Sequence, residues 1–121
     1  MYSERLLQHF RNPRYVGELD PPAVTVEVMN PICGDVLRLS VRLEGHTVTE
    51  ARYKTRGCTA SIAAGEALCE WMHGRSAGDL AQLTADDVDA AVGGLRPESK
   101  HAAVLCIDGV KALLRSLGLQ G

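Results

Sequence analysis

The spacing of hydrophobic and polar residues predicts strands in the first half of the chain. Apolar and polar side chains alternate over residues 24–29, 36–43 and 48–54, and this two-residue period is typical of half-buried strands. The segment 44–46, which contains a glycine, has the composition of a hairpin turn. The pattern therefore indicates an antiparallel meander of three strands.

Helical periodicity is found on both sides of this meander. Residues 2–10 have apolar positions spaced for a short amphipathic helix, which Asn12 and Pro13 end. A longer helix is predicted over about residues 59–73, before Gly74. Its buried side is expected to carry Ile62, Ala63, Leu68, Cys69 and Met72.

The last third of the chain also has a helical pattern. Short helices are predicted at residues 80–83 and 86–92, with Thr84 as an N-cap, and a final helix at about 98–117 follows two glycines. Strands followed by helices, without repeats or a linker, predict an α+β fold. We expect a small antiparallel three-stranded sheet with helices packed on one face.

The composition narrows the kinds of partner that the chain is expected to bind. Its 121 residues are enough for one domain, expected to span residues 1–121. Thirteen basic and fifteen acidic residues give a net charge of −2, so neither nucleic acid nor a membrane surface is an expected partner. No leader opens the sequence and no apolar run approaches the ~18 residues of a membrane span, so we expect a cytoplasmic protein. In that reducing compartment, four cysteines favour metal or sulfur chemistry over disulfides.

Two of the cysteines lie beside glycines in predicted loops. Cys33 precedes Gly34 and Asp35 between two strands, and Cys58 follows Gly57 where a strand gives way to a helix. Glycine lets the backbone approach a bound atom closely, and Asp35 can turn a carboxylate oxygen toward a metal that Cys33 holds. Cys58 lies at a helix N-terminus, whose amides stabilise a thiolate. The pattern predicts a metal or sulfur site.

Several short motifs occur in order along nearly the whole chain. They are YSE at 2–4, NPR at 12–14, VG at 16–17, CGD at 33–35, ARYKTRGC at 51–58, SIA at 61–63 and EWMHGRS at 70–76. In these motifs the sequence resembles the U-type iron–sulfur cluster assembly scaffolds, the family of IscU, SufU and the NifU N-terminal domain.

The resemblance implies a function and a set of partners. Such scaffolds assemble a [2Fe–2S] cluster from iron, electrons and sulfur that a cysteine desulfurase delivers as persulfide, and then transfer the cluster to apoproteins. They also hold Zn²⁺ or Fe²⁺ in the same site. A chaperone pair is a further family partner, and the segment that it reads is kept only in part in LRPESK at 95–100.

The resemblance also implies the ligands. Cys33, Asp35 and Cys58 match the family's two loop cysteines and its aspartate. The family's last helix opens with a histidine and a third cysteine, the usual sulfur acceptor. Aligning that helix by its apolar residues places His101 at the histidine and Ala102 at the cysteine. The expected metal and cofactor ligands are therefore Cys33, Asp35, Cys58 and His101.

Cys106 has two open interpretations. Five residues turn a helix by roughly 500°, so His101 and Cys106 point about 140° apart, and Cys106 lies about 6 Å along the axis from Ala102 on the same face. Cys106 either packs in the core as a small apolar residue or replaces the missing cysteine as ligand or sulfur acceptor. Cys69 is expected to pack in the core.

Three functions are consistent with this ligand set. The first is a cluster scaffold that works with a desulfurase. The second is a diverged relative whose zinc is structural and which acts through protein contacts, without assembling clusters. The third is a zinc enzyme, but no glutamate or histidine stands out as a general base beside the ligands, so we expect no enzymatic activity.

Overall fold

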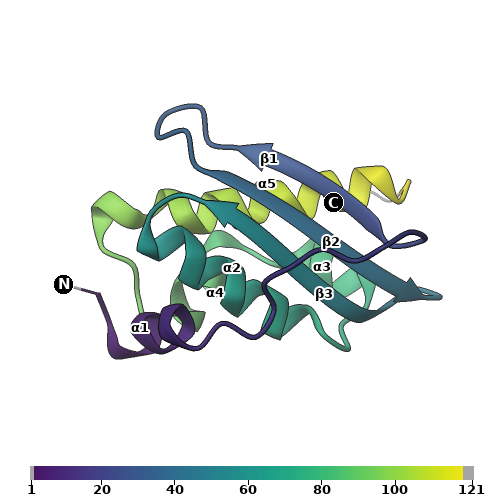
Figure 1. The fold of residues 1–121 in the computed structure, drawn as a ribbon, viewed down its shortest axis with the longest axis horizontal. Helices are drawn as coiled ribbons and strands as arrows, with labels where there is room; N and C mark the ends of the chain where they lie inside the picture. The colour runs from purple at the N-terminus through teal and green to yellow at the C-terminus, as the bar shows by residue number, and fades with distance from the viewer. Residues whose placement is uncertain (1, 119–121) are drawn as a thin grey trace.

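The structure, a computed structural model, describes residues 2–118 and contains one sheet with helices behind it (Figure 1). In chain order the elements are α1 (Glu4–Arg11), β1 (Val24–Met29), β2 (Val36–Glu44), β3 (Thr47–Arg56), α2 (Thr59–Met72), α3 (Ala77–Gln82), α4 (Ala85–Ala91), a 3₁₀ turn (Pro97–Ser99) and α5 (His101–Ser116).

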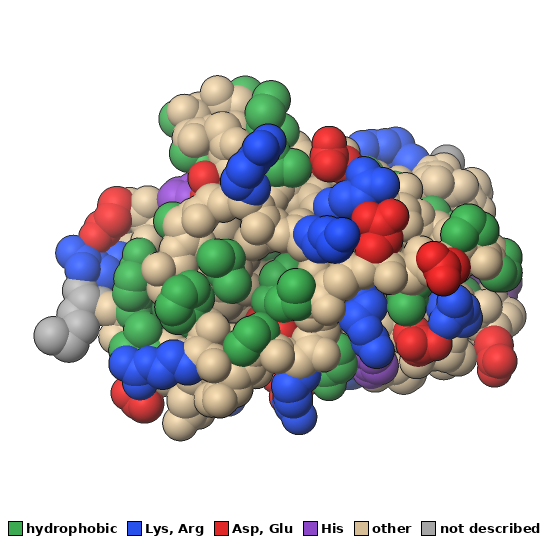
Figure 2. All heavy atoms as spheres, viewed as in Figure 1, with side chains coloured by type: hydrophobic (Ala, Val, Ile, Leu, Met, Phe, Trp, Pro, Cys, Tyr) green, Lys and Arg blue, Asp and Glu red, His purple; other side chains and the backbone are tan. Residues whose placement is uncertain are grey.

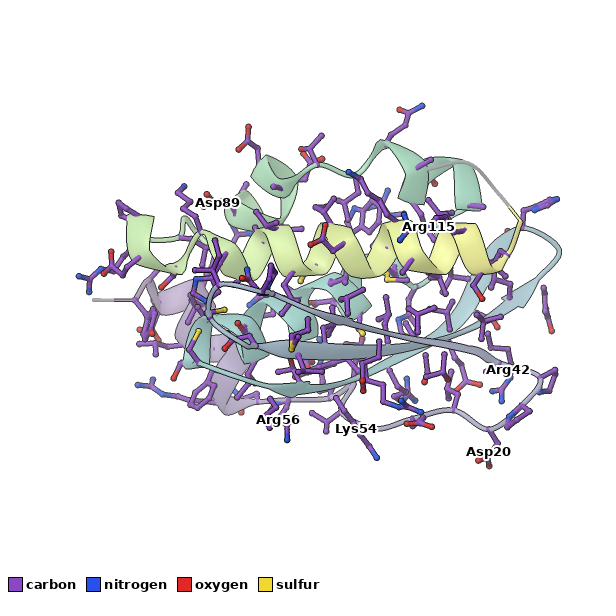
Figure 3. All side chains as sticks on the ribbon, turned by 90° about the horizontal axis from the view of Figure 1, so that it is seen from above. Asp20, Arg42, Lys54, Arg56, Asp89 and Arg115 are labelled. Atoms are coloured by element: carbon purple, nitrogen blue, oxygen red, sulfur yellow. The ribbon has the colours of Figure 1, made fainter. Side chains whose placement is uncertain are left out.

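The sheet is an antiparallel meander with the strand order β1-β2-β3. Alternation sets its two faces, because Leu37, Leu39 and Val41 of β2 are buried toward the helices while the residues between them face the other way. Figure 3 shows Lys54 and Arg56 of β3 pointing away from α5, and charged side chains of both signs gather over this outer face (Figure 2). The predicted α+β fold is confirmed.

Two helices cover the inner face of the sheet. α5 packs against β1 and β2, and α2 packs against β3. α2 also contacts α1, α4 and α5, so ten of its fourteen residues are buried rather than one side only. The enclosed carboxylate of Glu66 accepts hydrogen bonds from the backbone amides of Arg14 and Tyr15, which ties the segment after α1 to α2.

Two of the predicted helix starts lie three residues from the starts in the structure. α3 begins at Ala77, because Ser76 and Asp79 form a capping box that starts the helix three residues before the predicted position. α5 begins at His101 rather than near residue 98, because the chain first makes the 3₁₀ turn. The predicted hairpin and the Thr84 cap are present as expected.

Four ends of strands and helices that matter for the site lie at the same end of the molecule. β1 ends, β2 begins, and α2 and α5 both begin at the left of Figure 1. The loop between β1 and β2 stands out there as a lobe with hydrophobic side chains on its surface (Figure 2). Ile32 in this loop is 95% exposed. Within residues 2–118, no helix combines the length and the hydrophobicity that a membrane crossing requires.

Candidate metal centre

The loop between β1 and β2 is shaped by Asn30, which is almost fully buried. Its side-chain oxygen accepts hydrogen bonds from the amides of Ile32 (2.9 Å) and Cys33 (3.3 Å). Its carbonyl accepts a bond from the amide of Gly34, whose φ of +78° closes the turn in a conformation that favours glycine. These bonds hold Cys33 on the surface, two residues before Asp35, which directly precedes β2.

The start of α2 is capped by a residue from elsewhere in the chain. Cys58 occupies the N-cap position but makes no side-chain capping bond of its own. The Oδ2 atom of Asp35 lies 3.5 Å from the amide nitrogen of Cys58 and accepts a 2.6 Å hydrogen bond from the hydroxyl of Ser61. Asp35 therefore takes the place of a capping side chain, and the carboxylate is drawn to the helix N-terminus.

Gly57 makes room for this arrangement. A Cβ atom at residue 57 would lie 2.5 Å from the carboxyl carbon of Asp35 and 2.6 Å from its Oδ2. These separations are far below van der Waals contact, so any larger residue at 57 would displace the carboxylate. The glycine is required here for close approach to Asp35.

His101 is the first residue of α5, and polar contacts hold that helix start in place. Asp89, in α4, accepts a 2.5 Å hydrogen bond from the amide of Leu95 and pairs with the ammonium group of Lys100. Figure 3 shows Asp89 beside the beginning of α5. Asp89 thus holds Lys100, the residue before His101, and fixes the loop that leads into α5.

Three of the four expected ligands form one close group at this end of the fold, and Cys58 adjoins this group. Ligand atoms of Cys33, Asp35 and His101 all lie within 4.8 Å of one another. Cys58 joins them through the imidazole, with 3.6 Å between its Sγ and Nε2 of His101. The same Nε2 atom lies 3.3 Å from Oδ2 of Asp35.

Two of these separations match those expected between ligands of a tetrahedral metal ion. Zinc bonds of about 2.3 Å to sulfur and about 2.0–2.1 Å to nitrogen and oxygen give tetrahedral edges of about 3.5 Å for S···N and about 3.3 Å for N···O. The observed distances of 3.6 Å and 3.3 Å match both edges. Two thiolates, one imidazole and one carboxylate are also donors that Zn²⁺ and Fe²⁺ accept.

The surroundings keep Asp35 in the charged form that a metal needs. Burial raises the pKa of its carboxyl group, but the hydrogen bonds from Ser61 and the Cys58 amide, together with the nearby His101, outweigh this effect. The pKa of Asp35 therefore lies below its usual value. The carboxylate is available as a ligand at neutral pH.

The other two cysteines lie away from this centre, in the core. Cys69 in α2 and Cys106 in α5 are 0% and 1% exposed. Burial raises the pKa of Cys106 to about 12 and that of Cys69 well above its ordinary value. Ala102, on the same face of α5 as Cys106, is buried too. Of the two interpretations of Cys106, the structure favours core packing.

Two residues that shape the site, Asn30 and Ser61, were not singled out by the sequence reasoning, and Gly57 was expected only to allow close approach to a bound atom. Asn30 orders the Cys33 loop, Gly57 admits the Asp35 carboxylate, and Ser61 donates a hydrogen bond to it. Asn30 carried a local signal, since an asparagine before a proline is typical of a turn. The contact of Ser61 with Asp35 joins residues 26 positions apart, so no local spacing indicates it.

Comparisons with known proteins agree with this geometry. The model of the family described as NifU-like N terminal domain matches residues 1–117. The chain is 36% identical over 118 residues to the iron–sulfur cluster assembly scaffold protein IscU of Azotobacter vinelandii, and the match covers 94% of this chain and 91% of that protein. It is also 40% identical over 111 residues to the bifunctional protein NifU/MnmA of Rubrobacter xylanophilus. That match covers 90% of this chain but only 23% of the relative.

Solved structures share the fold at low sequence identity. A NifU-like protein (N-terminal) from Brucella abortus superimposes with a TM-score of 0.79 at 17% identity, and the match covers 96% of this chain and 93% of that one. A scaffold protein described for the SUF system of Fervidobacterium islandicum gives 0.74 at 16% identity, over 92% and 94% of the two chains. With a family model that spans 117 residues and relatives above 30% identity, the chain belongs to the NifU-like N-terminal domain family.

Proposed function

We propose that this chain is a scaffold for iron–sulfur cluster assembly. In this proposal it receives sulfur from a cysteine desulfurase, builds a [2Fe–2S] cluster on Cys33, Asp35, Cys58 and His101, and transfers the cluster to apoproteins. The observation that carries the proposal is the close group of Cys33, Asp35 and His101, with the Sγ atom of Cys58 3.6 Å from the imidazole. Family membership and relatives named as such scaffolds support it.

The ligand set suits a cluster that must be released. A [2Fe–2S] cluster takes four terminal ligands, usually thiolates. Replacing two thiolates by an imidazole and a carboxylate weakens the hold on the iron, because these donors are harder and exchange more readily. The same four groups would hold Zn²⁺ or Fe²⁺ before assembly.

Sulfur is expected to arrive at Cys33 or Cys58. Cys69 and Cys106 are enclosed by the core, and residue 102 is alanine. In the transfer step a thiolate of the scaffold attacks the outer sulfur of the donor persulfide, the donor S–S bond breaks, and the donor cysteine leaves as thiolate. A separate reductant then supplies the electrons that convert the bound sulfur to sulfide.

The rest of the proposal concerns cellular context. We propose that residues 1–121 act as a single scaffold domain in the cytoplasm, without an enzymatic reaction of their own, and that apo iron–sulfur proteins are the clients. One relative, from Drosophila melanogaster, is named an iron–sulfur cluster assembly enzyme.

Anaerobic reconstitution tests the proposal. The protein is incubated with Fe²⁺, L-cysteine, a cysteine desulfurase and a dithiol reductant, and the visible spectrum is followed. We expect sulfide-to-iron charge-transfer bands in the scaffold fraction, followed by their appearance in an added apo-ferredoxin. A protein that binds zinc but never develops these bands would instead be the diverged, zinc-holding relative.

Asp35 offers a sharper test of the release function. Because a carboxylate is a weak, exchangeable ligand for a cluster, Asp35→Ala should lengthen the half-life of an assembled cluster rather than prevent assembly. The decay of the charge-transfer bands in air measures this half-life. A folded Asp35→Ala protein that assembles no cluster would make Asp35 an essential ligand and contradict its proposed role in release.

A further inference from the structure

Ser61 lies in the first turn of α2 and is 2% exposed. Its hydroxyl donates a 2.6 Å hydrogen bond to Oδ2 of Asp35 and lies 3.5 Å from Sγ of Cys58. A buried serine is therefore in contact with two of the proposed ligands but belongs to neither of the loops that carry them.

The oxygen that Ser61 contacts is the one that faces the imidazole. Oδ2 of Asp35 is the atom 3.3 Å from Nε2 of His101, the separation that a shared tetrahedral ion requires. The Cys58 amide donates to the same oxygen at the longer distance of 3.5 Å, and the Cys33 side chain also hydrogen-bonds the carboxyl group. The 2.6 Å bond from Ser61 is shorter than the contacts of this oxygen with the Cys58 amide and with the imidazole.

Helix propensity does not explain a serine here. Alanine forms helices better than serine, and the neighbouring buried positions Ala60, Ala63 and Ala64 are all alanine. A buried hydroxyl is costly without a partner. The hydroxyl of Ser61 is therefore best accounted for by its bond to Asp35.

We propose that Ser61 is a positioning residue for the metal ligand Asp35. Its hydroxyl holds Oδ2 at the distance from Nε2 of His101 at which both atoms bind one ion. Hydrogen bonds of this kind to a ligand commonly change metal affinity by about 10–100-fold. The inference rests on the metal site of the proposed function and adds to it a residue that binds no metal itself.

Zinc titration against a chelating dye tests this role. Ser61→Ala should lower zinc affinity about 10-fold, the low end of the range for groups that support a ligand. Ser40→Ala is the matched control, because Ser40 is a buried serine whose hydroxyl bonds Thr25 within the sheet. This control should leave zinc affinity unchanged.

Dependence on Asp35 separates positioning from a general loss of structure. In an Asp35→Ala background, Ser61→Ala should cause no further loss of zinc affinity, because the group that Ser61 orients is gone. With Co²⁺ in place of zinc, Ser61→Ala should also alter the ligand-field bands of the parent protein, whereas Ser40→Ala should not.

The zinc measurements distinguish a failure of the positioning role of Ser61 from a failure of the metal site. If the parent binds zinc and Ser61→Ala binds it equally well, or if the loss persists undiminished without Asp35, the positioning role is overturned while the metal site stands. If the parent binds no zinc, the metal site of the proposed function fails, and this inference fails with it.

Discussion

The four cysteines form two pairs in opposite surroundings. Cys33 and Cys58 lie at the loop end of the molecule, where the β1–β2 loop meets the starts of α2 and α5, among groups that bind metals. Cys69 and Cys106 lie in the interior between the helices and the sheet, where burial raises their pKa values and keeps them as thiols. Residue type alone does not distinguish these pairs. The difference comes from what surrounds each sulfur, so changes at the loop end should alter metal binding, and changes in the interior should alter stability.

The largest effect is expected when a thiolate ligand is removed. Cys58→Ser should weaken zinc binding by more than the roughly 10–100-fold loss that follows removal of a group that only supports a ligand. Competition with a chelator of known affinity measures this change. Cys69→Ser is the matched interior control, and zinc affinity that fell equally in both variants would abolish the distinction between the pairs.

The next comparison uses two residues of α5, the expected ligand His101 and Cys106, whose role the sequence left open. His101→Ala should lower zinc affinity at least about 10-fold. Cys106→Ser should leave zinc affinity unchanged but lower the free energy of unfolding by about 1–2 kcal/mol, because a hydroxyl replaces a thiol in an apolar pocket. Urea denaturation of the metal-free proteins provides the second quantity. If Cys106→Ser lost the metal and His101→Ala kept it, Cys106 would be the ligand.

A smaller effect is expected from Gly57→Ala. The added methyl group would displace the Asp35 carboxylate, with which it would overlap, and zinc affinity should fall by up to about 10-fold. The φ angle at Gly57 is not in the left-handed region, so alanine fits the backbone there and the effect is confined to the carboxylate. An Asp35→Ala background should remove the effect of Gly57→Ala, which the chelator assay can show.

The smallest effect concerns the start of α5 and depends on pH. The hydrogen bond from Lys100 lowers the pKa of Asp89, and the bond from the Leu95 amide adds to this effect. Slight burial of the carboxyl group opposes it but is outweighed. A lowered pKa in the folded state means that the stabilisation is present above the unfolded value of about 3.9 and disappears as pH falls through the folded value. Asp89→Asn should therefore be less stable than the parent at pH 6, and the difference should shrink below about pH 4. A difference in thermal midpoint that stayed constant down to pH 2 would contradict this.

Most of the fold could be predicted because its signals are local. The bounds of β1 agree with the pattern to the residue, and the hairpin after β2 follows from the strand period and a glycine. The start of α3 carried a local signal as well, a serine three residues before an aspartate, which the helical pattern of 80–83 obscured. The late start of α5 has no comparable signal.

The sequence allowed the ligands of the candidate site to be predicted, but not the residues that support them. Cysteines beside glycines, an aspartate and a helix-start histidine could be chosen as ligands by residue type and by resemblance. Their supporting contacts could not, because the bond from Ser61 to Asp35 and the space above Gly57 arise when β2 is placed beside the start of α2. Whether Cys106 of α5 faces the core or the site likewise depends on where the helix begins.

The most direct measurement is native mass spectrometry after anaerobic assembly with a cysteine desulfurase, Fe²⁺ and L-cysteine. The parent protein is predicted to gain the mass of a [2Fe–2S] cluster, and Cys106→Ser should gain the same mass. Cys33→Ala and Cys58→Ala should gain none while remaining folded by circular dichroism. A cluster mass that persists in Cys33→Ala and Cys58→Ala but is absent from Cys106→Ser would contradict the assignment of the site to the loop cysteines.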